Sequence, residues 1–288
     1  MADPESSLSK IPPEFARPWV VTAAWLYQHL GQPDVVIADC RFSLADPQAG
    51  QQHYAASHIP GAYYFDLNRD LSGPVGRHGG RHPLPEVTLL AQKLGAAGIH
   101  SGVDAPWVIA YDDTRLAFAA RFWWLLRYLG HERVAVLDGG FRGWQEAGYP
   151  VSDAIPAVRS ASFIPRPRLD WVVDIETVKA RKDQPNTVLI DSREAERYRG
   201  EREPIDPVAG HIPGAVNCPW QEVTDTQGYV RPLAEQQQRW NWVPPATELL
   251  VYCGSGVTAC VNLLSLELAG LPTGKLYAGS WSDWCSYL

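Results

Sequence analysis

Four short motifs occur twice in this chain of 288 residues, in the same order in each half. The clearest is HIPGA, which is identical in the two copies. The four pairs are VVIADCR (35–41) and TVLIDSR (187–193), HIPGA (58–62) and HIPGA (211–215), PWVIAYDD (106–113) and ELLVYCG (248–254), and LDGGFRGW (137–144) and YAGSWSDW (277–284). Motifs that recur in one order over most of a chain indicate two copies of a single fold. The length agrees with this, since the usual prior is one domain for roughly 150 residues.

Within each half, short runs rich in β-branched residues alternate with segments of helical periodicity. In the segment 116–130, Phe118, Phe122 and Leu126 recur at the spacing of one helix face. Strands that alternate with helices predict a parallel sheet covered by helices on both faces. We therefore expect an α/β protein in which each half is a small parallel sheet flanked by helices. The reactive edge of each sheet should lie at the carboxyl ends of its strands.

The repeat also sets the expected domain boundaries. We predict a first domain at 1–151, with its core at about 32–151, and a second domain at 183–288. The segment 152–182 is rich in Pro, Ser and Arg and has no apolar period in its first part, which is typical of an extended linker. The first half carries an insertion around the Gly- and Pro-rich stretch 71–85, which we interpret as a loop.

Composition and charge argue against several classes of function. The formal net charge is -7 and basic residues form no run, so the chain offers little to a nucleic-acid backbone. The N-terminus lacks the apolar segment of a signal peptide, and no stretch approaches the about 18 apolar residues of a membrane span. We therefore expect no membrane partner and a cytoplasmic location.

The cysteines are spaced singly, with no CxxC pair, so neither a disulfide framework nor a zinc site is indicated. This pattern favours a reducing compartment. The default interpretation of each thiol is a small apolar core residue. The five residues are Cys40, Cys218, Cys253, Cys260 and Cys285.

Comparing the halves distinguishes residues that stabilise the fold from candidate catalytic residues, because motifs kept in both copies are expected to serve the fold. Asp39 and Arg41 recur as Asp191 and Arg193, so we interpret this pair as structural. His211 opens the second HIPGA, where a turn explains the Pro and Gly that follow.

The informative difference follows the apolar runs WVIAY and LLVY. The next residue is Asp112 in the first half and Cys253 in the second. A strand-to-helix loop can turn backbone N–H groups inward at the positive end of a helix dipole, which favours a thiolate and a persulfide anion. Gly254 and Gly256 would let the backbone approach the sulfur. We predict that Cys253 is reactive; the alternative is a glycine-rich turn with an ordinary buried cysteine.

Together these features resemble the tandem-domain rhodaneses. That family has tandem α/β halves, the DSR and HIPGA motifs, a cysteine in the second half only and a terminal GSW segment. The resemblance covers the chain from about Val21 to Leu288. It implies a catalytically inert first domain and a second domain whose cysteine, here Cys253, carries sulfur as a persulfide.

The loop CGSGVTA at 253–259 is similar to that of the 3-mercaptopyruvate sulfurtransferases within this family. Thiosulfate enzymes typically place Arg or Lys after the cysteine, which matches a dianionic donor, whereas the three residues after Cys253 are neutral. The resemblance implies that Ser255 polarises the donor ketone or relays a proton. It also implies that other loop residues contact the donor, namely Gly254, Gly256, Val257 and Thr258.

An arginine shortly after DSR binds the donor carboxylate in the enzymes that this chain resembles. Arg197 matches it, and the first-half counterpart is Ala45; a solvated surface arginine is the alternative. Arg202 is only a guess for a second carboxylate-binding residue, because the segment before HIPGA is shorter here. Some of these enzymes complete a Cys-Ser-Asp relay with a first-domain carboxylate. Asn68 stands at that position and cannot serve, while Asp66 nearby could equally point into the core.

The resemblance implies a sulfurtransferase that moves sulfur from 3-mercaptopyruvate through Cys253 to a small thiol, reduced thioredoxin or cyanide, with release of pyruvate and ping-pong kinetics. No metal or organic cofactor is implied. The first alternative is a thiosulfate sulfurtransferase with the same nucleophile. A phosphatase would need an arginine for its phosphate, and none follows Cys253. A non-enzymatic sulfur carrier does not explain why Cys253 and Arg197 are confined to one half.

Overall fold

The computed structural model describes residues 19–288, which fall into two compact units. The first 18 residues, on which the absence of a signal peptide was judged, lie outside the described part. Unit 1 contains the described chain up to Leu71, together with Pro85–Pro167 and Thr226–Val230. Unit 2 contains Ser72–Leu84, Arg168–Asp225 and Arg231–Leu288.

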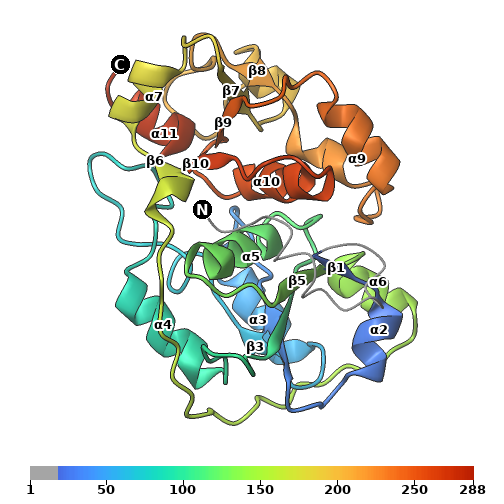
Figure 1. The fold of residues 1–288 in the computed structure, drawn as a ribbon. Coiled ribbons are helices and arrows are strands. Elements are labelled where there is room, and N and C mark those ends of the chain that lie inside the picture. Colours follow the sequence, from blue (N-terminus) through green and yellow to red (C-terminus); the bar gives the residue numbers. More distant parts are fainter. Residues whose placement is uncertain (1–18) are drawn as a thin grey trace. The chain divides into compact units, whose positions relative to one another are not determined.

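Unit 1 is built on a parallel sheet with the strand order β1-β5-β4-β2-β3 (Figure 1). Its strands are β1 (Val20–Val21), β2 (Val35–Asp39), β3 (Tyr63–Tyr64), β4 (Trp107–Tyr111) and β5 (Val134–Leu137). Its helices are α2 (Ala23–Gln28), α3 (Ala49–Ala56), α4 (Val87–Ala96), α5 (Ala119–Tyr128) and α6 (Gly140–Glu146).

The core of unit 1 explains why the sequences of its strands are continuous apolar runs. Every residue of β2, β4 and β5 is buried, as expected for strands covered on both faces. Alternate residues of these strands form a cluster with α2 and α6, in which Trp144 is fully buried. Helix α5 packs against β4 and β5 with residues outside that cluster, so it covers the opposite face.

Unit 2 repeats this architecture, with the strand order β6-β10-β9-β7-β8 in an all-parallel sheet. Its strands are β6 (Val172–Val173), β7 (Thr187–Asp191), β8 (Val216–Asn217), β9 (Glu248–Tyr252) and β10 (Lys275–Tyr277). Its helices are η1 (Leu169–Trp171), α7 (Ile175–Arg181), α8 (Ala195–Tyr198), η2 (Trp220–Val223), α9 (Leu233–Trp240), α10 (Ala259–Leu268) and α11 (Ser280–Cys285). The two strand orders correspond one to one, which confirms the predicted α/β fold in two copies.

The motifs kept in both halves form the same contacts in each unit. Arg41 Nη2 lies 2.7 Å from Asp39 Oδ2, and Arg193 Nη2 lies 2.6 Å from Asp191 Oδ2. Each arginine also donates to the backbone carbonyl of the residue immediately before HIPGA, which is Ser57 in unit 1 and Gly210 in unit 2. These buried ion pairs tie the end of one strand to the HIPGA turn, which agrees with their interpretation as scaffold.

The structure shows that the segment 152–182 is not a linker throughout. Its second part forms η1, β6 and α7, and β6 is the edge strand that pairs with β10. In the first half, likewise, β1 and α2 precede the expected core start at about residue 32. Both edge strands are two residues long, so their stability comes from pairing with a distant strand rather than from a local pattern.

The insertion at 71–85 is a loop without helix or strand, as predicted, but most of it does not belong to the unit of the first half. Residues Ser72–Leu84 belong to unit 2. Backbone and side-chain contacts hold this segment against α11: Gly79 N donates to Asp283 Oδ1 at 2.6 Å and Arg81 N to Ser282 Oγ at 3.1 Å. The segment is therefore part of the fold that carries Cys253.

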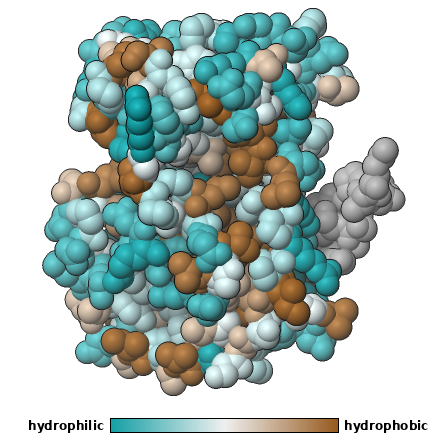
Figure 2. All heavy atoms as spheres, turned by 90° about the vertical axis from the view of Figure 1, so that its left-hand side faces the viewer, coloured by the Kyte–Doolittle hydropathy of each residue, from teal (hydrophilic) through white to brown (hydrophobic). Residues whose placement is uncertain are grey.

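Hydrophobic side chains are concentrated in the two cores. On the face drawn in Figure 2, hydrophilic residues predominate and hydrophobic ones lie among them in groups. Among the described residues, no helix is long and apolar enough to cross a membrane.

Candidate active site

Cys253 follows the last residue of β9, at the carboxyl edge of the sheet of unit 2. Its side chain is buried, with 1% of the residue exposed. Its backbone N–H donates to Ser280 Oγ at 3.1 Å, and its carbonyl accepts from Trp281 N at 3.0 Å. The start of α11 therefore fixes the backbone on both sides of the sulfur-bearing residue.

The loop from Cys253 to α10 depends on glycine at Gly256. Its φ of +75° is rare for residues with a side chain, and a methyl group placed there would lie 3.0 Å from Ala278 Cα. Val257 is buried in the same loop and Thr258 precedes the first residue of α10. The structure thus places all of the predicted loop residues in one turn between β9 and α10.

Ser255 is paired with a histidine that the sequence analysis did not identify. His82 Nδ1 lies 2.7 Å from Ser255 Oγ, and both side chains are buried. His82 comes from the segment 72–84. A hydroxyl bonded to an imidazole can pass a proton in either direction, which a lone serine cannot do.

Arg197 lies in the last turn of α8, and only 8% of the residue is exposed. Its guanidinium contacts two buried carboxylates: Glu203 Oε1 is 2.7 Å and Asp206 Oδ2 is 3.0 Å from Nη2. Arg197 is therefore not a solvated surface arginine. A methyl group placed on Gly254 would lie 3.4 Å from Arg197 Nη1, so this guanidinium faces the residue after the nucleophile.

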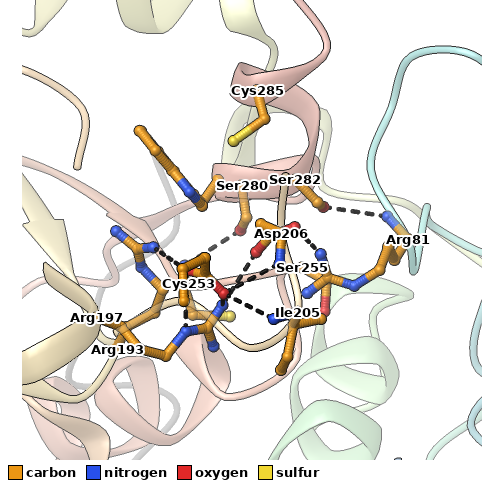
Figure 3. Close-up of polar contacts among 12 residues, drawn as sticks. Arg81, Arg193, Arg197, Ile205, Asp206, Cys253, Ser255, Ser280, Ser282 and Cys285 are labelled. Atoms are coloured by element: carbon orange, nitrogen blue, oxygen red, sulfur yellow. Dashed lines mark hydrogen bonds and ion pairs between the residues drawn. The ribbon is translucent and has the colours of Figure 1, made fainter. Parts of the chain in front are cut away.

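A second guanidinium reaches the same place from the segment 72–84. Arg81 Nη1 forms an ion pair with Asp206 Oδ1 (Figure 3). Neither Arg81 nor His82 was predicted, because the segment has no counterpart in the second half. The available signal was composition: two arginines and two histidines among the glycines and prolines of an unmatched insertion.

Other residues considered from the sequence lie elsewhere. Arg202 is exposed and lies 3.9 Å from Glu196, so it is not part of the cluster around Arg197. In unit 1, Asp66 is buried and accepts from the backbone N–H groups of Asn68 and Arg69, which commits its carboxylate to a local turn. Within residues 19–288, no group of metal-ligating side chains is present.

Three of the remaining cysteines have a raised pKa, which disfavours a thiolate, and the fourth lies inside a helix. Burial raises the pKa of the Cys218 thiol to about 11. Burial and then the carboxylate of Asp39 raise the pKa of Cys40 above its usual range. Burial also raises the pKa of Cys285. Cys260 lies inside α10, with Sγ 3.5 Å from the carbonyl oxygen of Gly256.

In unit 1 the loop that corresponds to the cysteine loop is filled by a carboxylate. Asp112 accepts four backbone N–H groups, from Thr114, Leu116, Phe118 and Ala119, at 2.8–3.0 Å. Burial raises the pKa of Asp112 to about 6, while these hydrogen bonds act in the opposite direction. The loop of the first half therefore binds an anion that is part of the chain itself.

Comparisons with known proteins agree with this arrangement. The family model described as a rhodanese-like domain matches residues 22–147 and 174–287. A probable 3-mercaptopyruvate sulfurtransferase of Pseudomonas aeruginosa is 46% identical over 271 residues, which cover 92% of this chain and 94% of that protein. The 3-mercaptopyruvate sulfurtransferase of Escherichia coli is 32% identical over 274 residues, with 92% and 94% covered.

Two solved structures extend the comparison to three dimensions. The 3-mercaptopyruvate sulfurtransferase from Leishmania major superposes with a TM-score of 0.83 at 28% identity, covering 96% of this chain and 76% of that chain. A 3-mercaptopyruvate sulfotransferase from Escherichia coli gives 0.80 at 32% identity, covering 92% and 99%. With a family match in both halves and a fold shared over nearly its full length, this chain belongs to the rhodanese family, as a protein of two tandem rhodanese-like domains.

Proposed function

We propose that this protein is a 3-mercaptopyruvate sulfurtransferase, with Cys253 as the nucleophile that carries the sulfur. The observation that carries the proposal is the Ser255–His82 pair, at 2.7 Å, in the turn that begins with Cys253. A hydroxyl and an imidazole suit a donor whose ketone must be polarised and whose product must gain a proton. The similarity to relatives named for this activity supports the same donor.

In the first half-reaction, the Cys253 thiolate attacks the thiol sulfur of 3-mercaptopyruvate. The carbon–sulfur bond breaks, and its electron pair passes into the adjacent ketone to give the enolate of pyruvate. Ser255 polarises the ketone oxygen and supplies a proton, which His82 restores to the serine. Pyruvate leaves, and Cys253 keeps the transferred sulfur as a persulfide.

In the second half-reaction, an acceptor nucleophile attacks the outer sulfur of the persulfide. The sulfur–sulfur bond breaks, the electron pair returns to Cys253 as its thiolate, and the acceptor leaves with the sulfur. A small thiol, reduced thioredoxin or cyanide would serve, and we propose that the reaction takes place in the cytoplasm. Unit 1 has a carboxylate where unit 2 has its thiol, so we propose that unit 1 carries no sulfur.

Donor preference tests this function directly. The kcat/KM for 3-mercaptopyruvate should exceed that for thiosulfate by at least about tenfold, equivalent to about 1.4 kcal/mol in the barrier. The two donors should be compared on one preparation with the same acceptor. A higher kcat/KM for thiosulfate would show that the family assignment stands while the proposed donor is wrong.

A further inference from the structure

Two guanidinium groups lie beside Gly254, the residue after the proposed nucleophile. A methyl group placed on Gly254 would lie 3.1 Å from Arg81 Nη2 and 3.4 Å from Arg197 Nη1. The two side chains come from different parts of unit 2, since Arg81 belongs to the segment 72–84 and Arg197 to α8 (Figure 3). Their positive charges therefore meet beside the reactive loop.

The protein fixes each guanidinium by its other nitrogen atoms. Glu203 accepts from Arg197 Nε at 3.2 Å and from Nη2 at 2.7 Å. Asp206 bridges the two arginines, with Oδ1 on Arg81 Nη1 and Oδ2 3.0 Å from Arg197 Nη2. The carboxylates of Glu203 and Asp206 are buried, so these contacts orient both guanidiniums strongly.

The nitrogen atoms that face Gly254 are left available. Within residues 19–288, neither Arg81 Nη2 nor Arg197 Nη1 donates a hydrogen bond to the protein. Burial and the nearby charge of Arg197 lower the pKa of Arg81, but an arginine stays protonated at neutral pH. Two charged donors thus converge on one point beside Cys253.

We propose that Arg81 is the second residue that binds the carboxylate of the donor, with one carboxylate oxygen on Arg81 Nη2 and the other on Arg197 Nη1. This inference rests on the proposed function, because it concerns the donor of that reaction. The carboxylate of Asp206 already bridges the two guanidinium groups, which shows that Arg81 and Arg197 can bind one carboxylate together. The donor carboxylate would bridge the same two groups on their other side.

The arrangement favours a donor that has a carboxylate. Two guanidiniums from separate segments fix the direction of a carboxylate, whereas one alone leaves it free to swing. The carbon chain of the donor would then extend past Gly254 toward Cys253. Arg81 is thus proposed as the second carboxylate-binding residue instead of Arg202, which is exposed and paired with Glu196.

The first experiment compares 3-mercaptopyruvate with its methyl ester, which keeps the thiol and ketone but loses the charge. Arg81→Ala should lower kcat/KM for the acid roughly tenfold or more, mainly through KM, and lower that for the ester by much less. Arg81→Lys should recover part of the loss. Arg77→Ala is the matched control, because Arg77 is an exposed arginine of the same segment. An equal loss for acid and ester, or no loss for the acid, would overturn the role of Arg81.

A binding measurement separates this proposal from the proposed function. Pyruvate has the same carboxylate and ketone, and should protect Cys253 from alkylation by iodoacetamide, as followed by mass spectrometry of the Cys253 peptide. Arg81→Ala should raise the pyruvate concentration needed roughly tenfold, and Arg77→Ala should not change it. If wild-type protein shows this protection but does not turn over 3-mercaptopyruvate, the proposed function fails and the carboxylate site stands. If protection is the same in wild-type and Arg81→Ala, the carboxylate site fails.

Discussion

At the scale of single residues, Cys253 differs from the other thiols in its surroundings rather than in its exposure. Cys40 and Cys253 are each 1% exposed. The charges that act on Cys40 are carboxylates, Asp39 first among them, whereas Cys253 precedes the glycine that two guanidiniums face. Negative neighbours oppose a thiolate, so Cys40 is poorly suited to attack.

We expect Cys253 alone to carry sulfur. After treatment with the donor, mass spectrometry should find one additional sulfur atom on the peptide that contains Cys253, and Cys253→Ser should abolish turnover. Cys260→Ser is a suitable control, because Cys260 lies in the adjacent helix and is also fully buried. Persistent activity in Cys253→Ser, with sulfur found on another cysteine, would refute the assignment.

We expect Arg197 to act in the donor half-reaction. Losing one partner of a desolvated charge pair typically costs about 2–5 kcal/mol, so Arg197→Ala should lower kcat/KM for 3-mercaptopyruvate by roughly 30-fold or more. Arg197→Lys should restore only part, since an ammonium cannot reproduce the planar geometry of a guanidinium. Rapid mixing should show slow pyruvate release and normal discharge of preformed persulfide. Equal slowing of both steps would indicate a structural role.

Ser255 and His82 should behave as one unit. Ser255→Ala and His82→Ala should each slow pyruvate release by roughly 100-fold, the lower range for general acid–base catalysis. The double variant should be no slower than either single one, because the two side chains pass the same proton. Discharge of preformed persulfide serves as the internal control. Additive losses in the double variant would show that the two residues act independently.

At the scale of the element, the same strand-to-helix loop has two different occupants in the two units. In unit 2 it presents Cys253, and in unit 1 the backbone N–H groups close on the carboxylate of Asp112. Leu116 has a φ of +70° in that loop, a conformation that costs energy for a branched residue. The four hydrogen bonds to Asp112 offset this cost.

The buried carboxyl of Asp112 should make unit 1 sensitive to pH. Burial raises its pKa to about 6, above the ordinary value of about 4, so the folded state retains a proton that the unfolded state releases. Its contribution to stability is therefore present below about pH 4 and lost as the pH rises through 6. From pH 4 to pH 7 the wild type should lose on the order of 3 kcal/mol relative to Asp112→Asn.

Urea denaturation of both proteins at several pH values, followed by the fluorescence of the tryptophans in unit 1, would measure this difference. Asp112→Asn is nearly isosteric, so its own loss of hydrogen bonds is the same at each pH. A difference that grows in favour of the wild type as the pH rises would mean that the backbone N–H groups outweigh burial and lower the pKa.

At the scale of the whole molecule, the parts that could be predicted are those encoded by contiguous residues. The two parallel sheets, the position of Cys253 after β9 and the buried Asp191–Arg193 pair all follow from short motifs that occur twice. Strand β6 could not be predicted, because two valines become a strand only by pairing with β10. The association of segment 72–84 with unit 2 depends on contacts with α11, which no local pattern in the segment specifies.

Because segment 72–84 belongs to unit 2, dividing the gene between the two repeats would separate residues of the candidate site. A cut placed between the two repeats as they appear in the sequence would leave Ser255 and Arg197 on one product and His82 and Arg81 on the other. The second repeat expressed alone would therefore lack part of the candidate site, although it contains the thiol. The first repeat of the sequence thus supplies two side chains to the candidate site of unit 2, and a product that contains the second repeat alone should not assemble that site.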